Sequence, residues 1–423
     1  MSLIARSDDL RRNNQRRILH VLRRHGPMSR TEISAATGLS ASTVTAITAA
    51  FLDSSVLIET PSPDNALSRR GRPQVTLALN PSAASIAALS LSLNRVSAAV
   101  VDYAGNVVGE VVNRVSTRTA DGPGLANAMA DALRAAIDAS PAPLGPLRHI
   151  AMGVQGVTDS EGTTMLWSPI TRHANLALSR LMGDAFGVPA TLANDCNMIA
   201  QALKWRFPDH FSASFAAVLL SHGIGMGLIV NNQVVGGISS SATEFGHMIH
   251  AQDGAQQGAL CRCGRHGCVE AYAGDYAIWR AAHALNPRSP PVDDLDPETM
   301  RELADRARKN GRGAEYEAYR SAGLAIGSAL RSMFALFDPF PVAFVGTGAA
   351  AFDLLEAPIR EAIGDSAIGM ISSQVETFSF PDEFPLVRDG AAIKALDLLD
   401  NHVFAPAEAP ITAARERRMG HAS

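Results

Sequence analysis

The spacing of apolar residues near the beginning of the chain predicts three short helices. Ile18 and Leu22 share one face of a helix over residues 14–25, which a Gly-Pro pair ends. The next helix opens with a Ser-Arg-Thr-Glu capping box at 29–32, where the serine hydroxyl and the glutamate carboxylate satisfy each other's backbone N–H groups. Ser40 can cap a third helix. Two short helices joined by a glycine-containing turn are typical of a helix-turn-helix.

Two β-rich runs follow the helices and predict a wing. Residues 56–59 and 74–79 read as strands, and the polar loop between them ends in Arg-Arg-Gly-Arg-Pro. A slim, positively charged loop suits a narrow A·T-rich minor groove, where the negative potential is enhanced. The alternatives are a plain three-helix bundle and a flexible basic linker. The wing residues that we expect to contact DNA are Arg69, Arg70, Gly71 and Arg72.

The third helix is the expected recognition helix. In a helix-turn-helix, the second helix of the motif enters the major groove with its N-terminal residues first. Short hydroxyl side chains occupy these positions here, and they suit both phosphates and base edges. An arginine of the preceding helix can reach the DNA backbone. The predicted contacts of this part are Arg30, Ser40, Ser42, Thr43 and Thr45.

From residue 84 onward, β-rich runs alternate with segments of helical periodicity. This alternation predicts an α/β architecture, and no solenoid repeat is visible. A helix is expected at about 124–139. The expected strands are 85–93, 96–102, 107–112, 149–154, 215–220, 226–230 and 342–345.

Three of the four cysteines lie within eight residues, and this cluster is the most specific motif of the chain. Cys261, Cys263 and Cys268, together with His247, offer three thiolates and one imidazole, a ligand set that holds structural Zn²⁺ tetrahedrally. Cys261 and Cys263 are too close in sequence for an easy disulfide. Two further histidines compete for the fourth position, and free thiols are the alternative to a metal site. These competing histidines are His250 and His266.

Two weaker motifs lie between the strands. Asn194-Asp195 follows an apolar run, and an aspartate at a strand end can act as a general base on a hydroxyl, although Asn-Asp is also common in turns. Alternating glycines can let backbone N–H groups approach a phosphate, although a β-turn is the commoner reason for them. These glycines are Gly223, Gly225 and Gly227.

The charge is distributed unevenly along the 423 residues. Residues 1–80 contain 11 arginines, no lysine and six acidic residues, a formal charge of +5, whereas the remainder holds 26 basic and 35 acidic residues, or −9. A small basic module on an acidic body suggests that only the front end meets a polyanion. No apolar run reaches the roughly 18 residues of a membrane span, and the N-terminus does not read as a signal peptide. We therefore expect a cytoplasmic protein that associates with the nucleoid.

Together these motifs resemble the ROK family, named for repressors, open reading frames and kinases. The resemblance covers about residues 14–400, and it rests on Glu-x-Gly-His at 244–247, on Cys-x-Cys-Gly-x-x-Gly-Cys-x-Glu at 261–270 and on Arg-Gly-Arg-Pro at 70–73. It implies an actin-like, RNase H-like, two-lobed sugar-kinase fold behind a winged helix-turn-helix. It also implies zinc at His247 and the three clustered cysteines. The sugar-binding residues that it implies are Asn194, Asp195, Glu244, His247 and Glu270.

The departures from the family pattern affect catalysis. Family kinases hold Mg²⁺ and phosphates with an Asp-x-Gly-Gly-Thr loop, whereas Ser90–Asn94 here lacks the carboxylate and both glycines. Because phosphoryl transfer depends on positioning and charge neutralisation, we expect kinase activity to be lost, Asp195 to be vestigial and the glycines at 223–227 to be a vestigial phosphate loop. Ile170 stands where the kinases carry a sugar-contacting asparagine, for which Asn175 is a possible substitute.

The sequence therefore predicts a sugar-responsive repressor of carbohydrate genes, without enzymatic activity. Its partners would be a palindromic, partly A·T-rich DNA operator, a sugar or sugar phosphate, and further copies of itself in a homodimer or homotetramer. Two alternatives stay open: a bifunctional ATP-dependent sugar kinase, and a repressor released by a protein partner. The expected domains are a flexible N-terminus (1–13), a winged helix-turn-helix (14–80), lobe I (84–200, with helix 389–400 returning to it), lobe II with the zinc site (201–388) and a disordered tail (404–423).

Overall fold

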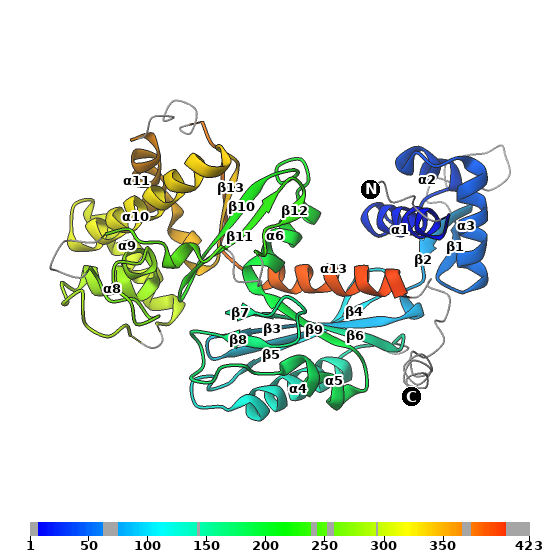
Figure 1. The fold of residues 1–423 in the computed structure, drawn as a ribbon, viewed down its shortest axis with the longest axis horizontal. Helices are drawn as coiled ribbons and strands as arrows, with labels where there is room; N and C mark the ends of the chain where they lie inside the picture. Colours follow the sequence, from blue (N-terminus) through cyan, green and yellow to red (C-terminus); the bar gives the residue numbers. More distant parts are fainter. Residues whose placement is uncertain are drawn as a thin grey trace, which may run out of the picture.

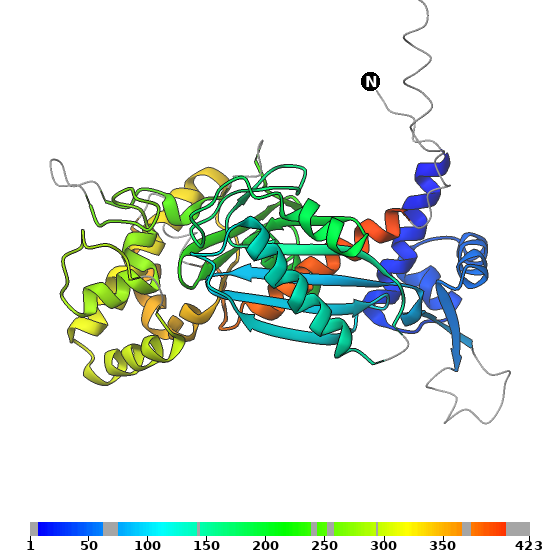
Figure 2. The same ribbon diagram turned by 90° about the horizontal axis from the view of Figure 1, so that it is seen from below.

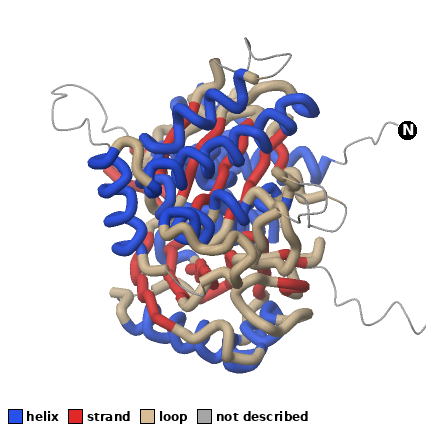
Figure 3. The backbone as a smooth tube through the Cα atoms, turned by 90° about the vertical axis from the view of Figure 1, so that its left-hand side faces the viewer, coloured by secondary structure: helices blue, strands red, loops and turns tan. Residues whose placement is uncertain are grey.

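The computed structural model places a small N-terminal domain beside a body of two lobes (Figure 1). In Figure 3, lobe II faces the viewer and helices cover its outer side. The predicted tail at 404–423 lies outside the described residues. The structure describes residues 7–61, 75–141, 144–237, 243–251, 258–292, 295–365 and 374–402.

The N-terminal domain has the three helices that the apolar spacing predicts. Ser29 and Glu32 form the reciprocal capping box, and Gly38 ends the second helix in the left-handed conformation. Ser40 caps the third helix. The first helix begins at Ser7, so residues 7–13, which the sequence analysis placed before the first helix, belong to it. The helices are α1 (Ser7–His25), α2 (Arg30–Thr37) and α3 (Ala41–Asp53).

An antiparallel pair of strands completes this domain. β1 (Leu57–Pro61) pairs with β2 (Val75–Leu79), so that Leu57 lies opposite Leu79. The buried side chains of Leu57, Leu77 and Leu79 join the helices in one apolar core. The four wing residues of the sequence prediction fall between the two strands, outside the described residues.

Lobe I contains a five-stranded mixed sheet in the order β5-β4-β3-β6-β9. Its first three strands are antiparallel, and β6 and β9 run parallel to β3. One face packs against α4 and α5 through a fully apolar cluster. The elements are β3 (Ser85–Ser92), β4 (Arg95–Asp102), β5 (Val107–Arg114), α4 (Gly122–Asp138), β6 (Leu147–Val154), β7 (Val157–Thr158), β8 (Met165–Trp167), α5 (Leu178–Phe186) and β9 (Ala190–Asn194).

Lobe II repeats this arrangement with a second five-stranded sheet, in the order β12-β11-β10-β13-β14. Again three antiparallel strands are followed by two parallel ones. Helices cover the outer face of this sheet. The elements are β10 (Phe215–Leu220), β11 (Ile224–Val230), β12 (Gln233–Val234), η3 (Phe245–His247), α7 (Glu270–Ala273), α8 (Asp275–Ala282), α9 (Pro297–Asn310), α10 (Ala314–Phe337), β13 (Val342–Val345), η4 (Thr347–Ala351), α11 (Phe352–Gly364) and β14 (Thr377–Phe380).

Two helices form a central layer between the sheets. α6 (Asp195–Arg206) follows β9 directly, and α13 (Phe384–His402) is the last described helix. Figures 1 and 2 both show α13 running from between the lobes to α1. The buried apolar side chains of both helices belong to one cluster that extends from the N-terminal domain to the inner faces of both sheets. The three parts of the molecule therefore share a continuous core.

Among the described residues, no single helix is long and apolar enough to cross a membrane. The pair α2 and α3 reaches the required length and apolarity only when taken together, and the chain bends by 119° between these two helices.

Candidate functional site

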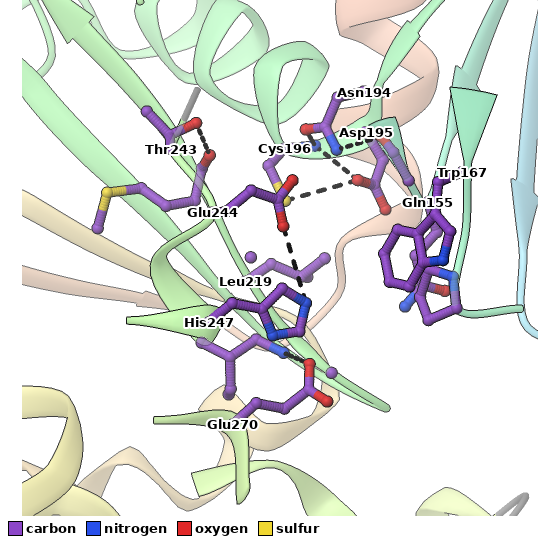
Figure 4. Close-up of a pocket in the computed structure, with 16 residues that line it drawn as sticks. Gln155, Trp167, Asn194, Asp195, Cys196, Leu219, Thr243, Glu244, His247 and Glu270 are labelled. Atoms are coloured by element: carbon purple, nitrogen blue, oxygen red, sulfur yellow. Dashed lines mark hydrogen bonds and ion pairs between the residues drawn. The ribbon is translucent and has the colours of Figure 1, made fainter. Parts of the chain in front are cut away.

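The five residues that the resemblance assigned to sugar binding line a single cavity. Figure 4 shows the acidic side chains around it, with Asn194 and Asp195 on one side and Glu244, His247 and Glu270 on another. Asn194 ends β9 of lobe I and Asp195 follows it directly, whereas the other three belong to lobe II, so the cavity lies where the two lobes meet.

Asp195 occupies the first turn of α6 and is buried. Burial raises the pKa of its carboxyl group to about 7. Its Oδ1 accepts a hydrogen bond from the backbone N–H of Cys196 at 2.9 Å. A carboxyl group that titrates near neutrality in a cleft is a candidate for binding or proton transfer to a hydroxyl.

Asn194 has a largely structural role at this position. Its Oδ1 caps α6 by accepting hydrogen bonds from the N–H groups of Cys196 and Asn197, at 2.9 and 3.3 Å. Its Nδ2 donates to the backbone oxygen of Gly156 at 3.0 Å. The amide therefore fixes the start of α6.

Glu244 and His247 lie on one short helical turn, and their side chains face each other. The distance between Glu244 Oε2 and His247 Nε2 is 3.8 Å. Burial raises the pKa of the Glu244 carboxyl group. The other ring nitrogen of His247, Nδ1, lies 3.7 Å from the sulfur of Cys261. His247 thus connects the cavity to the cysteine cluster.

Glu270 makes a second connection between the cavity and the cluster. Its Oε2 lines the cavity beside the N–H of Ile224, at 3.3 Å. Its Oε1 accepts a hydrogen bond from Tyr276 at 3.2 Å and lies 3.5 Å from the sulfur of Cys261. With only 5% of its surface exposed, Glu270 is held in place by these contacts.

The predicted metal ligands come together. The ligand atoms of His247, Cys261, Cys263 and Cys268 all lie within 4.8 Å of one another, and the sulfurs of Cys263 and Cys268 are 3.9 Å apart. Four ligands at the Zn–S distance of about 2.3 Å would be separated by about 3.8 Å in a tetrahedron. Neither His250 nor His266 belongs to this group. The cluster can therefore hold a metal ion.

Sequence reasoning missed several residues of the cavity wall, among them Gln155, Trp167 and Cys196. Trp167 ends β8, is 38% exposed and meets the His247 ring edge-on, with ring centroids 6.2 Å apart. An aromatic residue before Ser-Pro was the only available signal. Ile170 is buried in the lobe I core and does not line the cavity, and the exposed Asn175 does not line it either.

The glycines at 223–227 have a packing role in the structure. A Cβ atom at Gly225 would collide with the sulfur of Cys196, and one at Gly227 would collide with the Cys196 backbone oxygen. A Cβ at Gly223 would lie 2.8 Å from Glu270 Oε2. Glycine at these positions lets β11 pack directly against α6. Their assignment to a former phosphate loop stays a prediction.

A second cavity, of about 370 Å³, lies next to the first and shares Asp195 as a wall. The turn between β3 and β4, which the resemblance equates with the phosphate loop of family kinases, forms part of its lining. Leu93 is buried in this turn, and Asn94 adopts a positive φ of 54°. The guanidinium of Arg95 lies 3.4 Å from the ring centroid of Phe384, across the same cavity.

Most of the predicted recognition residues are exposed on α3. Ser40, Ser42 and Thr45 face solvent, and Thr43 is half-buried. The Ser40 hydroxyl is engaged in capping, since it accepts from the Thr43 N–H at 3.2 Å. Arg30 donates to Thr48 at 3.2 Å and lies 4.0 Å from Glu59, so it also braces the domain. Two exposed alanines that the sequence analysis passed over share the α3 surface, Ala46 and Ala49.

Comparisons with known proteins agree with this arrangement. The sequence profile of the ROK family matches residues 88–383, and that of a winged helix-turn-helix DNA-binding domain matches residues 11–57. The chain is 25% identical over 366 residues to the xylose repressor of Caldicellulosiruptor bescii, covering 84% of this chain and 88% of that protein. It is 26% identical to the glucokinase of Streptomyces coelicolor, over 63% of this chain and 83% of the glucokinase.

The fold is likewise that of a solved ROK transcriptional regulator, a homologue of the Escherichia coli MLC protein. The two structures superpose with a TM-score of 0.74 at 23% identity, over 93% of this chain and 99% of the other. The ROK match spans well over half of the chain, and the winged helix-turn-helix match precedes it. The chain thus belongs to the ROK family and carries an N-terminal winged helix-turn-helix.

Proposed function

We propose that this chain is a transcriptional repressor of carbohydrate genes that is released from DNA by a sugar. One observation carries the proposal: the cavity lined by acidic side chains shares the wall residues Cys196 and Leu219 with the continuous apolar core that reaches the winged helix-turn-helix. The xylose repressor named above matches both parts of the chain over most of its length. The protein would act in the cytoplasm, at the nucleoid.

The chemistry of the cavity suits a polyhydroxylated ligand. Sugar hydroxyls donate hydrogen bonds to carboxylates, and such charge-assisted bonds are stronger than neutral ones. Asp195, Glu244 and Glu270 supply acceptors from different directions, and His247 adds a ring nitrogen. Trp167 provides an apolar surface for the C–H face of the ring. The net negative charge of this wall favours a neutral sugar over a sugar phosphate at this position.

The cavity is small for a sugar ring. Its volume is about 60 Å³, whereas cavities that enclose small ligands commonly measure roughly 300–1,000 Å³. We therefore expect a sugar ring to bind with a movement of the lobes or of side chains such as Trp167. A ligand that prefers one of two conformations shifts their populations, which is the basis of a switch.

The cluster of His247 and the three cysteines would hold a structural zinc ion. All four positions of a tetrahedral site are taken by protein ligands, so none remains for a reactive water. The ion would fix the loop that carries Glu244 and His247 relative to the segment that carries Glu270. Glu244 beside Nε2 of His247 would orient the imidazole, as carboxylates commonly do behind metal-bound histidines.

DNA binding would use the exposed surface of α3 together with the wing. The hydroxyls of Ser42 and Thr45 can reach base edges or phosphates, and Ala46 can contact a thymine methyl group. Arg69, Arg70 and Arg72 would enter the minor groove. A dimer would present two such units to a palindromic operator.

The direct test is fluorescence anisotropy of the full-length protein on DNA from upstream of its own gene. The titrants are D-xylose, D-glucose, N-acetyl-D-glucosamine and their phosphates. We expect tight binding in the absence of sugar and release by one neutral sugar. Binding that no titrant weakens would contradict the sugar-responsive function and favour release by a protein partner.

Sugar kinase activity is the second candidate function, supported by the matching glucokinase and by the intact Asp195. Two features of the second cavity oppose it. Ser90 and Leu93 replace the residues with which family kinases approach Mg²⁺ and phosphate, and Leu93 is buried there. We expect no ATP-dependent phosphorylation of the same sugars, and turnover above a protein-free blank would overturn this expectation.

A further inference from the structure

We propose that α6 and α13 transmit the state of the cavity to the winged helix-turn-helix through a joint at their C-terminal ends. This joint consists of His20, Arg23, Arg24, Tyr103, Trp205 and Asp400. The proposal rests on the proposed function, because it names the route by which the sugar would act on DNA binding. It makes Trp205 and Asp400 positioning residues for the DNA-binding domain.

The route through α6 begins in the cavity. Asp195 is the first residue of the helix and lines the cavity, whereas Trp205 lies in its last turn. The 12 residues of α6 span about 18 Å, and one regular helix moves as a unit over this length. A shift at Asp195 therefore displaces Trp205.

Trp205 contacts the first helix of the DNA-binding domain. Its ring meets that of His20 edge-on, with centroids 4.5 Å apart. The guanidinium of Arg24 lies 5.7 Å from the centroid of the Trp205 ring, within the range of a cation–π interaction. These contacts join α6 to one side of α1.

The route through α13 begins at the second cavity. Glu383, immediately before the helix, accepts a hydrogen bond from Ser221 of lobe II at 3.3 Å. Phe384, the first residue of α13, lies under Arg95 in the wall of that cavity. The 19 residues of α13 reach about 28 Å from this point to the DNA-binding domain.

Asp400, near the end of α13, holds α1 by a buried network. Its carboxylate pairs with Arg23 at 2.8 Å, and the two side chains are only 4% and 6% exposed. The Tyr103 hydroxyl donates to the same carboxylate at 2.8 Å. Removing one partner of a buried pair leaves an uncompensated charge, so the pair fixes the angle of α1 strongly.

Close packing couples the two routes. α13 crosses α6 at Gly390, where a Cβ atom would collide with the backbone oxygen of Met198. α6 in turn contacts β11 of lobe II at Gly227, as described above. A movement between the lobes cannot be absorbed at these backbone contacts, because close-packed interiors transmit displacement. The joint is where such a movement reaches α1.

The test compares the variants Trp205→Ala and Tyr103→Phe with the wild type, all as full-length protein. Three quantities are measured. The first is the affinity of each protein for the upstream DNA, and the second is the factor by which D-xylose or D-glucose lowers this DNA affinity. The third is the affinity of each protein for the same sugar, measured by calorimetry. We expect a wild-type factor of about 5 to 150, the usual range of allosteric coupling. In the variants this factor falls toward one, while the sugar still binds.

The control is Trp279→Ala, which removes a tryptophan that stacks on His283 in lobe II, away from the joint. This variant should keep the wild-type factor. If the sugar binds both joint variants normally and lowers their DNA affinity by the same factor as in the wild type, the proposal is overturned. The proposed function would then still stand.

Amide hydrogen exchange tests the route without any sugar. If calorimetry shows that the wild type binds none of the sugars, the proposed function fails. Amide hydrogen exchange still tests whether α6 connects the cavity to α1. We then expect Trp205→Ala to speed exchange both in α1 and in the first turn of α6, about 18 Å away along the helix. Exchange that changes only in α1 would overturn the route.

Discussion

The two five-stranded sheets have the same strand order, but different elements pack around them and the two lobes have different roles. The inner face of lobe I packs mainly against α13, and lobe I touches the DNA-binding domain directly where Arg23 donates to the backbone oxygen of Tyr103. The inner face of lobe II packs mainly against α6. Lobe II carries the cysteine cluster and most of the acidic side chains of the cavity. We call lobe I, which is fixed to the DNA-binding domain, the reading half. Lobe II, which reaches that domain through the central helices, is the sensing half.

The largest effect should follow removal of a ligand of the proposed zinc ion in the sensing half. We expect Cys268→Ser to abolish stoichiometric zinc and to expose the 258–270 segment to proteases, since structural zinc contributes roughly 10–16 kcal/mol of binding free energy in small domains. Sugar response should vanish while DNA affinity stays close to that of the wild type. Elemental analysis, limited proteolysis and anisotropy measure these outcomes.

The control for this prediction is Cys196→Ala, which changes the buried cysteine outside the cluster. It should retain full zinc content. If Cys268→Ser also abolishes DNA binding, the two halves unfold together and the division between them is wrong.

The next largest effect is on sugar affinity, at Asp195, where the cavity joins the two halves. Asp195→Asn removes the charge of one of the three carboxylates of the cavity, and hydrogen bonds to charged groups contribute about 1.5–3 kcal/mol. We expect sugar affinity to fall about 10- to 150-fold by calorimetry, with unchanged DNA affinity in the absence of sugar. An unchanged sugar affinity would show that the sugar binds elsewhere.

Gly390→Ala tests how closely α6 and α13 pack in the central layer. The added methyl group collides with the α6 backbone, so we expect a loss of about 1–3 kcal/mol in the free energy of unfolding in urea. Gly364→Ala is the matched control, because a Cβ atom there meets nothing within 4 Å. Equal stability of the two variants would mean that α6 and α13 do not pack as tightly as described.

The smallest effect is on pH dependence. Because burial raises the pKa of Asp195 to about 7, this carboxyl group is mostly protonated at pH 6 and mostly ionised at pH 8. A sugar that donates to the carboxylate should bind about tenfold more weakly at pH 6 than at pH 8. Asp195→Asn should remove most of this dependence, leaving the part due to Glu244, whose pKa is also raised by burial. Stronger binding at pH 6 would contradict this assignment.

Local signals in the sequence predicted local structure well. The capping box at Ser29, the cap at Ser40 and the strands on each side of the wing depend on neighbouring residues, and the structure has them. The start of α1 escaped prediction because residues 9–13 are exposed: Leu10 is 56% exposed, so no apolar periodicity marks this segment.

Features that depend on residues far apart in the chain could not be predicted from the sequence. The repeated strand order of the two lobes leaves no repeat in the sequence, because a sheet constrains burial and register but not residue identity. Ile170 was expected at the cavity and instead packs in the lobe I core. The ion pair between Arg23 and Asp400 joins residues 377 positions apart, and nothing near either residue indicates its partner.

The most direct test of the account is one anisotropy titration, in which the full-length protein on its upstream DNA is mixed with each sugar in turn. We expect one neutral sugar to release the wild type at micromolar to millimolar concentration and to release Asp195→Asn only at a concentration about 10- to 150-fold higher. Equal release of both proteins, or no release by any sugar, would contradict the claim that this cavity controls DNA binding.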